Sequence, residues 1–149
     1  MQRQHSQRPS GRRGAVVVEM AVVLPVFMMV VWGIVEFGRA MMVGQLVTNA
    51  ARFGAREAML DGSTNTAVIA SVQEFLIETV GGIRTSDITV TIRITPGTGN
   101  TNPGNQLSAA HVKDICQVSV TIPYSRVAYF SARFLQNANL RGVCSMRHE

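Results

Sequence analysis

Cysteine is scarce in this chain, with two residues among 149, and charged residues of both signs together make up only 15%. Aromatic residues contribute 6%, and no glycine period of the collagen type is present. The 46% of apolar residues excludes an intrinsically disordered chain, and the missing glycine period excludes a collagen-like one. The length allows one domain, or one small domain with an appendage, because two full-sized cores would need more residues.

The excess of basic residues is confined to the N-terminus. Four of the fourteen basic residues, Arg3, Arg8, Arg12 and Arg13, lie within the first fourteen positions, which contain no acidic residue. Residues 15–149 hold the other ten basic residues and all nine acidic ones, a formal charge of +1. The net charge of +5 therefore describes a basic leader and does not predict a nucleic-acid partner.

The sequence lacks the residue patterns of the common enzyme classes. The three histidines, His5, His111 and His148, have no metal-ligand spacing to another histidine, cysteine or aspartate. Neither a nucleophile elbow nor a phosphate-binding glycine loop occurs. We therefore expect no catalytic residues, no cofactor and no metal.

A long apolar run follows the basic leader. Residues 15–35 contain three non-apolar residues, Glu19, Pro25 and Gly33. As a helix this run would be about 31 Å long, close to the thickness of the hydrocarbon layer of a bilayer. A cleavable secretory signal is shorter and ends in a small-residue cleavage site, which residues 36–39 (EFGR) do not provide. The run therefore predicts a helix that stays in the membrane.

The distribution of positive charge predicts the orientation of this helix. By the positive-inside rule, the arginine-rich leader, residues 1–14, stays in the cytoplasm. The helix would then cross the inner (cytoplasmic) membrane once, over residues 15–36, with the lipid bilayer as its surroundings. An exported extension of the same helix, residues 37–60, and a small exported domain, residues 61–149, would follow.

Glu19 is a carboxylate inside the apolar run, where ionisable residues are rare and usually have a partner. Cleavage after Gly14 would give Ala15 a charged amine, four residues and one helical turn before Glu19. The carboxylate could neutralise that amine in its own chain or in a neighbouring subunit. The alternative is a protonated or snorkelling side chain near the membrane surface.

The surroundings of Glu19 resemble a known processing signal. Basic residues, a glycine, four apolar residues, a glutamate and an apolar helix form the class III signal of type IV prepilins. The chain is more narrowly similar to the TadE-like pseudopilins of the tight-adherence (Flp) pilus system. That similarity is carried by residues 13–21 (RGAVVVEMA), 33–39 (GIVEFGR) and 49–56 (NAARFGAR).

The resemblance implies a function and a set of partners. A prepilin peptidase would cut between Gly14 and Ala15. The mature chain would be a minor pilin-like structural subunit that assists assembly of a Flp-type pilus or a related secretion filament. Its further partners would be the inner-membrane assembly platform and other pilin-like subunits. The alternative is a stand-alone bitopic envelope protein whose exported domain binds a partner or ligand without any filament.

The exported part has the periodicities of a small α+β domain. Small residues recur at helical spacing along residues 40–58, which suits packing either on the chain's own domain or between subunits. An amphipathic stripe marks residues 66–80 as a second helix, and residues 88–94, 116–122 and 140–146 alternate as strands of a short antiparallel sheet. Residues 96–106 are expected to form a flexible loop.

Two specific contacts are also predicted. Cys116 and Cys144 both have the parity of the apolar face of their strands, and in an oxidising exterior a disulfide bond would stabilise the domain by roughly 2–4 kcal/mol. The alternative is two buried free thiols. Glu36 and Arg39, three residues apart on the helix, are expected to form an ion pair at the membrane surface.

Overall fold

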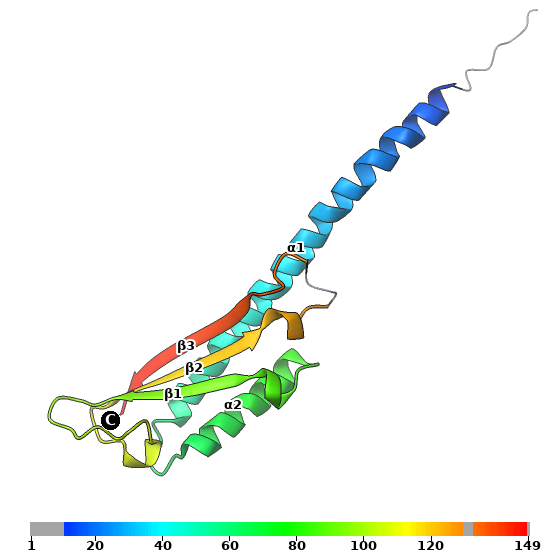
Figure 1. Ribbon diagram of the computed structural model, residues 1–149. Coiled ribbons are helices and arrows are strands. Elements are labelled where there is room, and N and C mark those ends of the chain that lie inside the picture. Colours follow the sequence, from blue (N-terminus) through cyan, green and yellow to red (C-terminus); the bar gives the residue numbers. More distant parts are fainter. Residues whose placement is uncertain (1–10, 130–132, 149) are drawn as a thin grey trace, which may run out of the picture. The chain divides into compact units, whose positions relative to one another are not determined.

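The computed structural model describes residues 11–129 and 133–148 of the chain (Figure 1). The chain divides into two compact units, Met1–Val35 and Glu36–Glu149. One helix, α1 (Gly11–Glu57), contributes residues to both units.

The portion of α1 in the first unit is apolar and exposed. Its most apolar 18-residue window has a mean hydropathy of 2.4, and none of that window is buried. By length and composition α1 can cross a membrane, as predicted, which is consistent with a single-pass membrane protein.

The second unit is α+β, which confirms the predicted fold class. It contains the end of α1, the helix α2 (Asn65–Val80) and three strands, β1 (Thr89–Thr95), β2 (Ile115–Pro123) and β3 (Asn139–Arg147). Short 3₁₀ helices lie at Thr85–Asp87, Leu107–Ala109 and Tyr124–Arg126. The strands form an antiparallel sheet in the order β1-β2-β3.

Local sequence explains where α2 begins and ends. The Thr64 side chain accepts a hydrogen bond from the backbone N–H of Ala67 at 3.3 Å, which satisfies one of the free donors at the helix start. At the other end Gly81 has a φ of +67°, a conformation that favours glycine and stops the helix. The predicted stripe is the buried face, formed by Val68, Val72, Leu76 and Val80.

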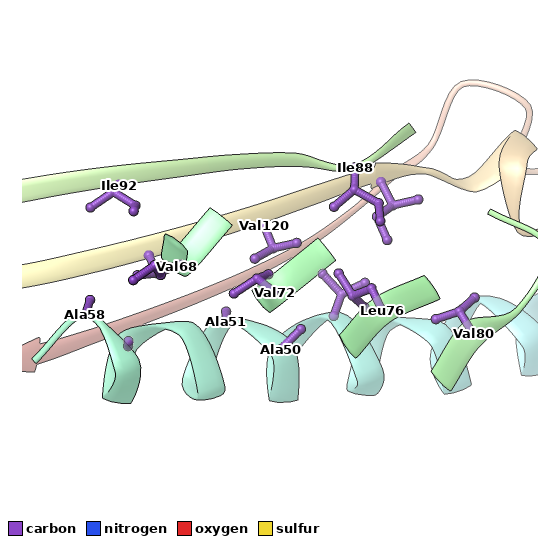
Figure 2. Packing of buried hydrophobic residues seen from close by; sticks show 14 of the residues in the cluster. Ala50, Ala51, Ala58, Val68, Val72, Leu76, Val80, Ile88, Ile92 and Val120 are labelled. Carbon is purple, nitrogen blue, oxygen red and sulfur yellow. The ribbon is translucent and has the colours of Figure 1, made fainter. Parts of the chain in front are cut away.

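The two helices cover one face of the sheet, and Figure 2 shows the core between them. Every second residue of β2 is buried against this core, namely Cys116, Val118, Val120 and Ile122. The side chains from α1 are small, with Ala50, Ala51, Ala55 and Ala58 fully or almost fully buried. The other face of the sheet is polar, and no helix of the described residues covers it (Figure 1).

Two glycines mark close approaches between elements. A Cβ at Gly54 of α1 would lie 2.5 Å from a methyl group of Val72 and 3.3 Å from one of Val118. A Cβ at Gly142 of β3 would lie 2.5 Å from the carbonyl oxygen of Val47 and 2.7 Å from the Cα of Thr48. At Gly142 the strand therefore packs directly on the backbone of α1, which leaves no room for a side chain.

These contacts show whether the small residues at 50–58 pack on the chain's own domain or between subunits. They are buried against α2 and the sheet of their own unit, so this part of the stripe packs on the chain's own domain. Gly44, nearer the membrane segment, differs, because a Cβ there would meet nothing within 4 Å.

The loop between β1 and β2 is held by side chains, contrary to the flexible loop predicted at 96–106. The buried Asp114 carboxylate accepts hydrogen bonds from the backbone N–H groups of Gly97 and His111, both at 2.8 Å, and from the Asn100 amide at 2.7 Å. The Asn100 side-chain bond, followed by the two backbone bonds, lowers the pKa of Asp114 from 3.8 to about 2. Asn105 adds a link to β1 by accepting the N–H of Ile94 at 2.9 Å.

Candidate functional site

The three residues predicted to govern processing lie on α1 in the first unit. Gly14, Ala15 and Glu19 are all exposed, and the four-residue spacing from Ala15 to Glu19 is one turn of this helix. A Cβ at Gly14 would meet nothing within 4 Å, so the glycine is not required by the packing of this chain.

In the second unit, a cluster of polar contacts joins its first residues, which belong to α1, to later segments of the chain. Glu36 is only 5% exposed and, with Asp114, is one of the two buried acidic residues in the described part of the chain. Its Oε1 accepts hydrogen bonds from the backbone N–H groups of Leu135 at 2.8 Å and Phe134 at 3.1 Å, and its Oε2 accepts that of Arg133 at 3.4 Å. A carboxylate with three N–H donors is satisfied by charge-assisted hydrogen bonds, which are stronger than neutral ones.

Arg39 makes a second set of contacts one turn further along α1. Its Nε donates to the carbonyl of Val127 at 3.1 Å, and one terminal nitrogen donates to that of Val80 at 3.4 Å. The guanidinium carbon lies 4.3 Å from the centre of the Tyr129 ring, within the range of a cation–π contact. Arg39 thereby joins α1 to the end of α2 and to the segment after β2.

Tyr124 completes the cluster. Its ring is 1% exposed, and its hydroxyl donates to the carbonyl oxygen of Glu36 at 2.9 Å. Burial raises the pKa of this hydroxyl, the charge of Glu36 raises it further, and Arg39 lowers it. Glu36, Arg39 and Tyr124 together are called the helix clamp below, because they attach α1 to three other segments of the unit.

The helix clamp corrects the predicted pairing of Glu36 with Arg39. Both side chains bind backbone groups from the C-terminal half of the chain, and among the described residues the ion pair within 4 Å is Arg126–Asp87. A glutamate at the end of an apolar run is visible in the sequence. Its partners, the N–H groups of residues 133–135, are about 97 positions away and have no side-chain signature.

The two cysteines share the core face of the sheet but are not bonded to each other. Both are free thiols; Cys116 is buried and Cys144 is half-buried. In the register Cys116 lies opposite Met146, and Cys144 lies opposite Val118. The cysteines are thus diagonal neighbours, about 7–8 Å apart in such a pair, which is longer than disulfide geometry allows. Burial raises the pKa of the Cys116 thiol, which makes it less reactive.

Metal-binding side chains are not gathered anywhere in residues 11–129 and 133–148, where no group of three histidine, cysteine or acidic residues is suitably placed. His111 is exposed in the β1–β2 loop, and His148 is buried beside it, where its backbone N–H donates to the Asp114 carbonyl at 2.8 Å. His5 lies outside the described residues.

Residues 14–56 match the family model described as TadE-like protein, which confirms the resemblance over that region. The matched region is α1 from Gly14 almost to its end and includes Glu19, Glu36 and Arg39, but no strand. Searches of curated proteins and of solved structures return no match. The match and the apolar helix together support a membrane-anchored protein related to the Tad pilus.

Proposed function

We propose that this chain is a minor pilin-like subunit, structural rather than catalytic, that assists assembly of a Flp-type pilus or a related secretion filament. The observation that carries the proposal is the TadE-like match at 14–56, which coincides with an exposed apolar helix bearing Glu19 one turn after the Gly14–Ala15 junction. The helix would lie in the inner membrane, with the basic leader in the cytoplasm and the second unit exported.

Processing by a prepilin peptidase is the first step of this proposal. Cleavage between Gly14 and Ala15 would remove the basic leader and place a charged amine at the end of the apolar helix. Glu19 can neutralise that amine in its own chain or in a neighbouring subunit. An unpaired buried charge costs roughly 3–5 kcal/mol, so the pair matters where subunits pack and exclude water.

The helix clamp suits a subunit that is moved by its membrane helix. Force applied along α1 reaches the second unit first at Glu36, where the carboxylate, Arg39 and the Glu36 carbonyl are bonded to three other segments. We infer that the clamp keeps the exported domain on α1 during extraction from the bilayer. Assembly platform and pilin-like partners would act on α1, the part that carries the family match.

The test of processing is the intact mass of protein extracted from membranes of cells with an active prepilin peptidase. The wild type should lack residues 1–14, and Gly14→Val should retain them, because a branched side chain replaces the small residue at the cut. Gly38→Val is the matched control, since a Cβ at either glycine meets nothing within 4 Å. A wild-type chain that still begins at Met1 would overturn the processing step.

The test of assembly compares Glu19→Val with the wild type. Membrane abundance should be unchanged or higher, because an apolar residue inserts more favourably than a carboxylate. The yield of sheared filaments or of cross-linked complexes should fall. Normal assembly with equal abundance would favour the stand-alone bitopic protein, in which the amine and Glu19 both reach water.

A further inference from the structure

In the second unit, the outward face of α2 and the uncovered face of the sheet carry charges of opposite sign. On the polar face of the sheet every charged residue is an arginine: Arg93 on β1, and Arg141 and Arg147 on β3, all exposed. Arg93 and Arg141 flank a hollow of about 570 Å³ whose other lining residues are uncharged. This surface is called the open sheet face below.

The complementary surface lies on α2. Its charged residues are Glu74 and Glu78, both exposed and four residues apart on one face of the helix. Exposed Ala67 and Ala70 continue the same stripe towards the helix start. The stripe formed by these four residues is called the α2 stripe below; neither of its glutamates belongs to the ion pair that the described part of the chain contains.

The α2 stripe and the open sheet face point in opposite directions. The buried side of α2 packs on the covered face of the sheet, through Val68, Val72 and Leu76 (Figure 2). The stripe faces away from the sheet on one side, and the arginines face away from it on the other. A contact between these two surfaces therefore cannot form within one chain, and only two copies of the chain, arranged front to back, can bring them together.

The open sheet face has the width of a helix. In the central strand the outward row is Gln117, Ser119 and Thr121, which are half-buried. The arginines belong to the edge strands beside it, and the Nε of Arg141 donates to the Ser119 hydroxyl at 3.1 Å. The edge strands of a three-stranded sheet are about 10 Å apart, close to the diameter of a helix with its side chains. A helix lying over β2 would have an arginine on each side within reach of its glutamates.

We propose that the open sheet face of one copy binds the α2 stripe of a second copy, with Arg93 and Arg141 holding Glu74 and Glu78. Because different surfaces meet, the contact is heterologous and repeats from copy to copy rather than closing a dimer. Confinement of the copies to one membrane in one orientation raises their effective concentration, so a weak contact suffices. This inference does not depend on the proposed function, because a membrane protein outside a filament could associate in the same way.

Charge reversal tests the contact with two variants of the full-length chain. The first, Arg93→Glu with Arg141→Glu, has two negative surfaces; the second, Glu74→Arg with Glu78→Arg, has two positive ones. All four side chains are exposed, so the fold should tolerate both variants. Association is measured by energy transfer between labelled copies in vesicles of neutral lipid, at low and high salt, with far-ultraviolet circular dichroism as a check of folding.

Each variant alone should lose about tenfold or more in association, because like charges then meet across the contact. An equal mixture of the two should recover the wild-type level, since every contact between unlike copies is again of opposite charge. High salt should weaken the wild-type association. Arg52→Glu with Arg56→Glu, which changes the exposed face of α1, is the control and should leave association unchanged.

Three outcomes would overturn the proposal: wild-type copies that do not associate, a single variant that associates as well as the wild type, or a mixture that does not recover. Binding of the wild type to anionic vesicles, abolished in the arginine variant but unchanged in the glutamate variant, would assign the open sheet face to lipid headgroups instead.

Discussion

Removal of the Glu36 carboxylate is the sharpest perturbation of the helix clamp. In Glu36→Ala the N–H groups of Leu135, Phe134 and Arg133 lose their acceptor, at 2.8, 3.1 and 3.4 Å. A hydrogen bond to a charged group contributes about 1.5–3 kcal/mol, and the longest of the three contributes least. Because residues 133 and 134 are exposed and their N–H groups can bind water, we expect a total loss of about 2–4 kcal/mol.

The loss should appear in two measurements on detergent-solubilised full-length protein. The melting temperature of the second unit should fall by roughly 8–16 °C, as expected for a domain of this size. Hydrogen exchange at the amides of Phe134 and Leu135 should accelerate more than exchange in β2, because the lost acceptor is local.

Two variants serve as controls for the clamp. Glu36→Gln keeps one carbonyl oxygen in place and should lose less than Glu36→Ala. Glu78→Ala removes an exposed glutamate and should change stability by less than about 0.5 kcal/mol. The reasoning is refuted if Glu36→Ala melts within about 2 °C of the wild type and leaves the exchange of Leu135 unchanged.

Three further outcomes are expected from other sites. Gly142→Ala should lower the free energy of unfolding, measured with denaturant, by at least about 2 kcal/mol, because its Cβ would collide with the backbone of α1. Gly38→Ala should not lower it, because a Cβ there meets nothing within 4 Å and alanine favours a helix; a Gly142→Ala variant as stable as the wild type would contradict the close approach. The Asp114 contribution to stability should be complete above the unfolded pKa of 3.8 and decline as the pH falls towards 2, because folding lowers this pKa; Asp114→Asn should flatten that decline in acid unfolding curves, and an unchanged slope would contradict it. Cys116 and Cys144 should both alkylate in denaturant without reductant, and a linked peptide pair in the mass spectrum would contradict the free thiols.

Local pattern alone was enough to predict the two α-helices and the three strands of this protein, but not its short 3₁₀ helices. The apolar run from 15 to 35 predicts a long helix because its character depends on consecutive residues only. The buried stripe of α2 repeats with the helical period of 3.6 residues, and the buried residues of β2 repeat with the strand period of 2. Both periods can be read from residues that are close together in the sequence. The TadE-like match likewise falls on a continuous segment, residues 14–56.

Contacts between residues far apart in the sequence, such as the pairing of the two cysteines, could not be predicted from local pattern. Parity placed both cysteines on the core face correctly, but the pairing of β2 with β3 offsets them by two residues, and parity carries no information about that offset.

Glu36 shows most clearly what the tertiary structure decided. The helical spacing predicted Arg39, three residues away, as the partner of Glu36. In an isolated helix the two side chains would be neighbours and could form an ion pair. In the folded unit the carboxylate is buried, and three backbone N–H groups almost one hundred residues later donate hydrogen bonds to it in place of water. Backbone donors are present at nearly every position of any sequence, so only the path of the chain selects which of them a buried charge will bind.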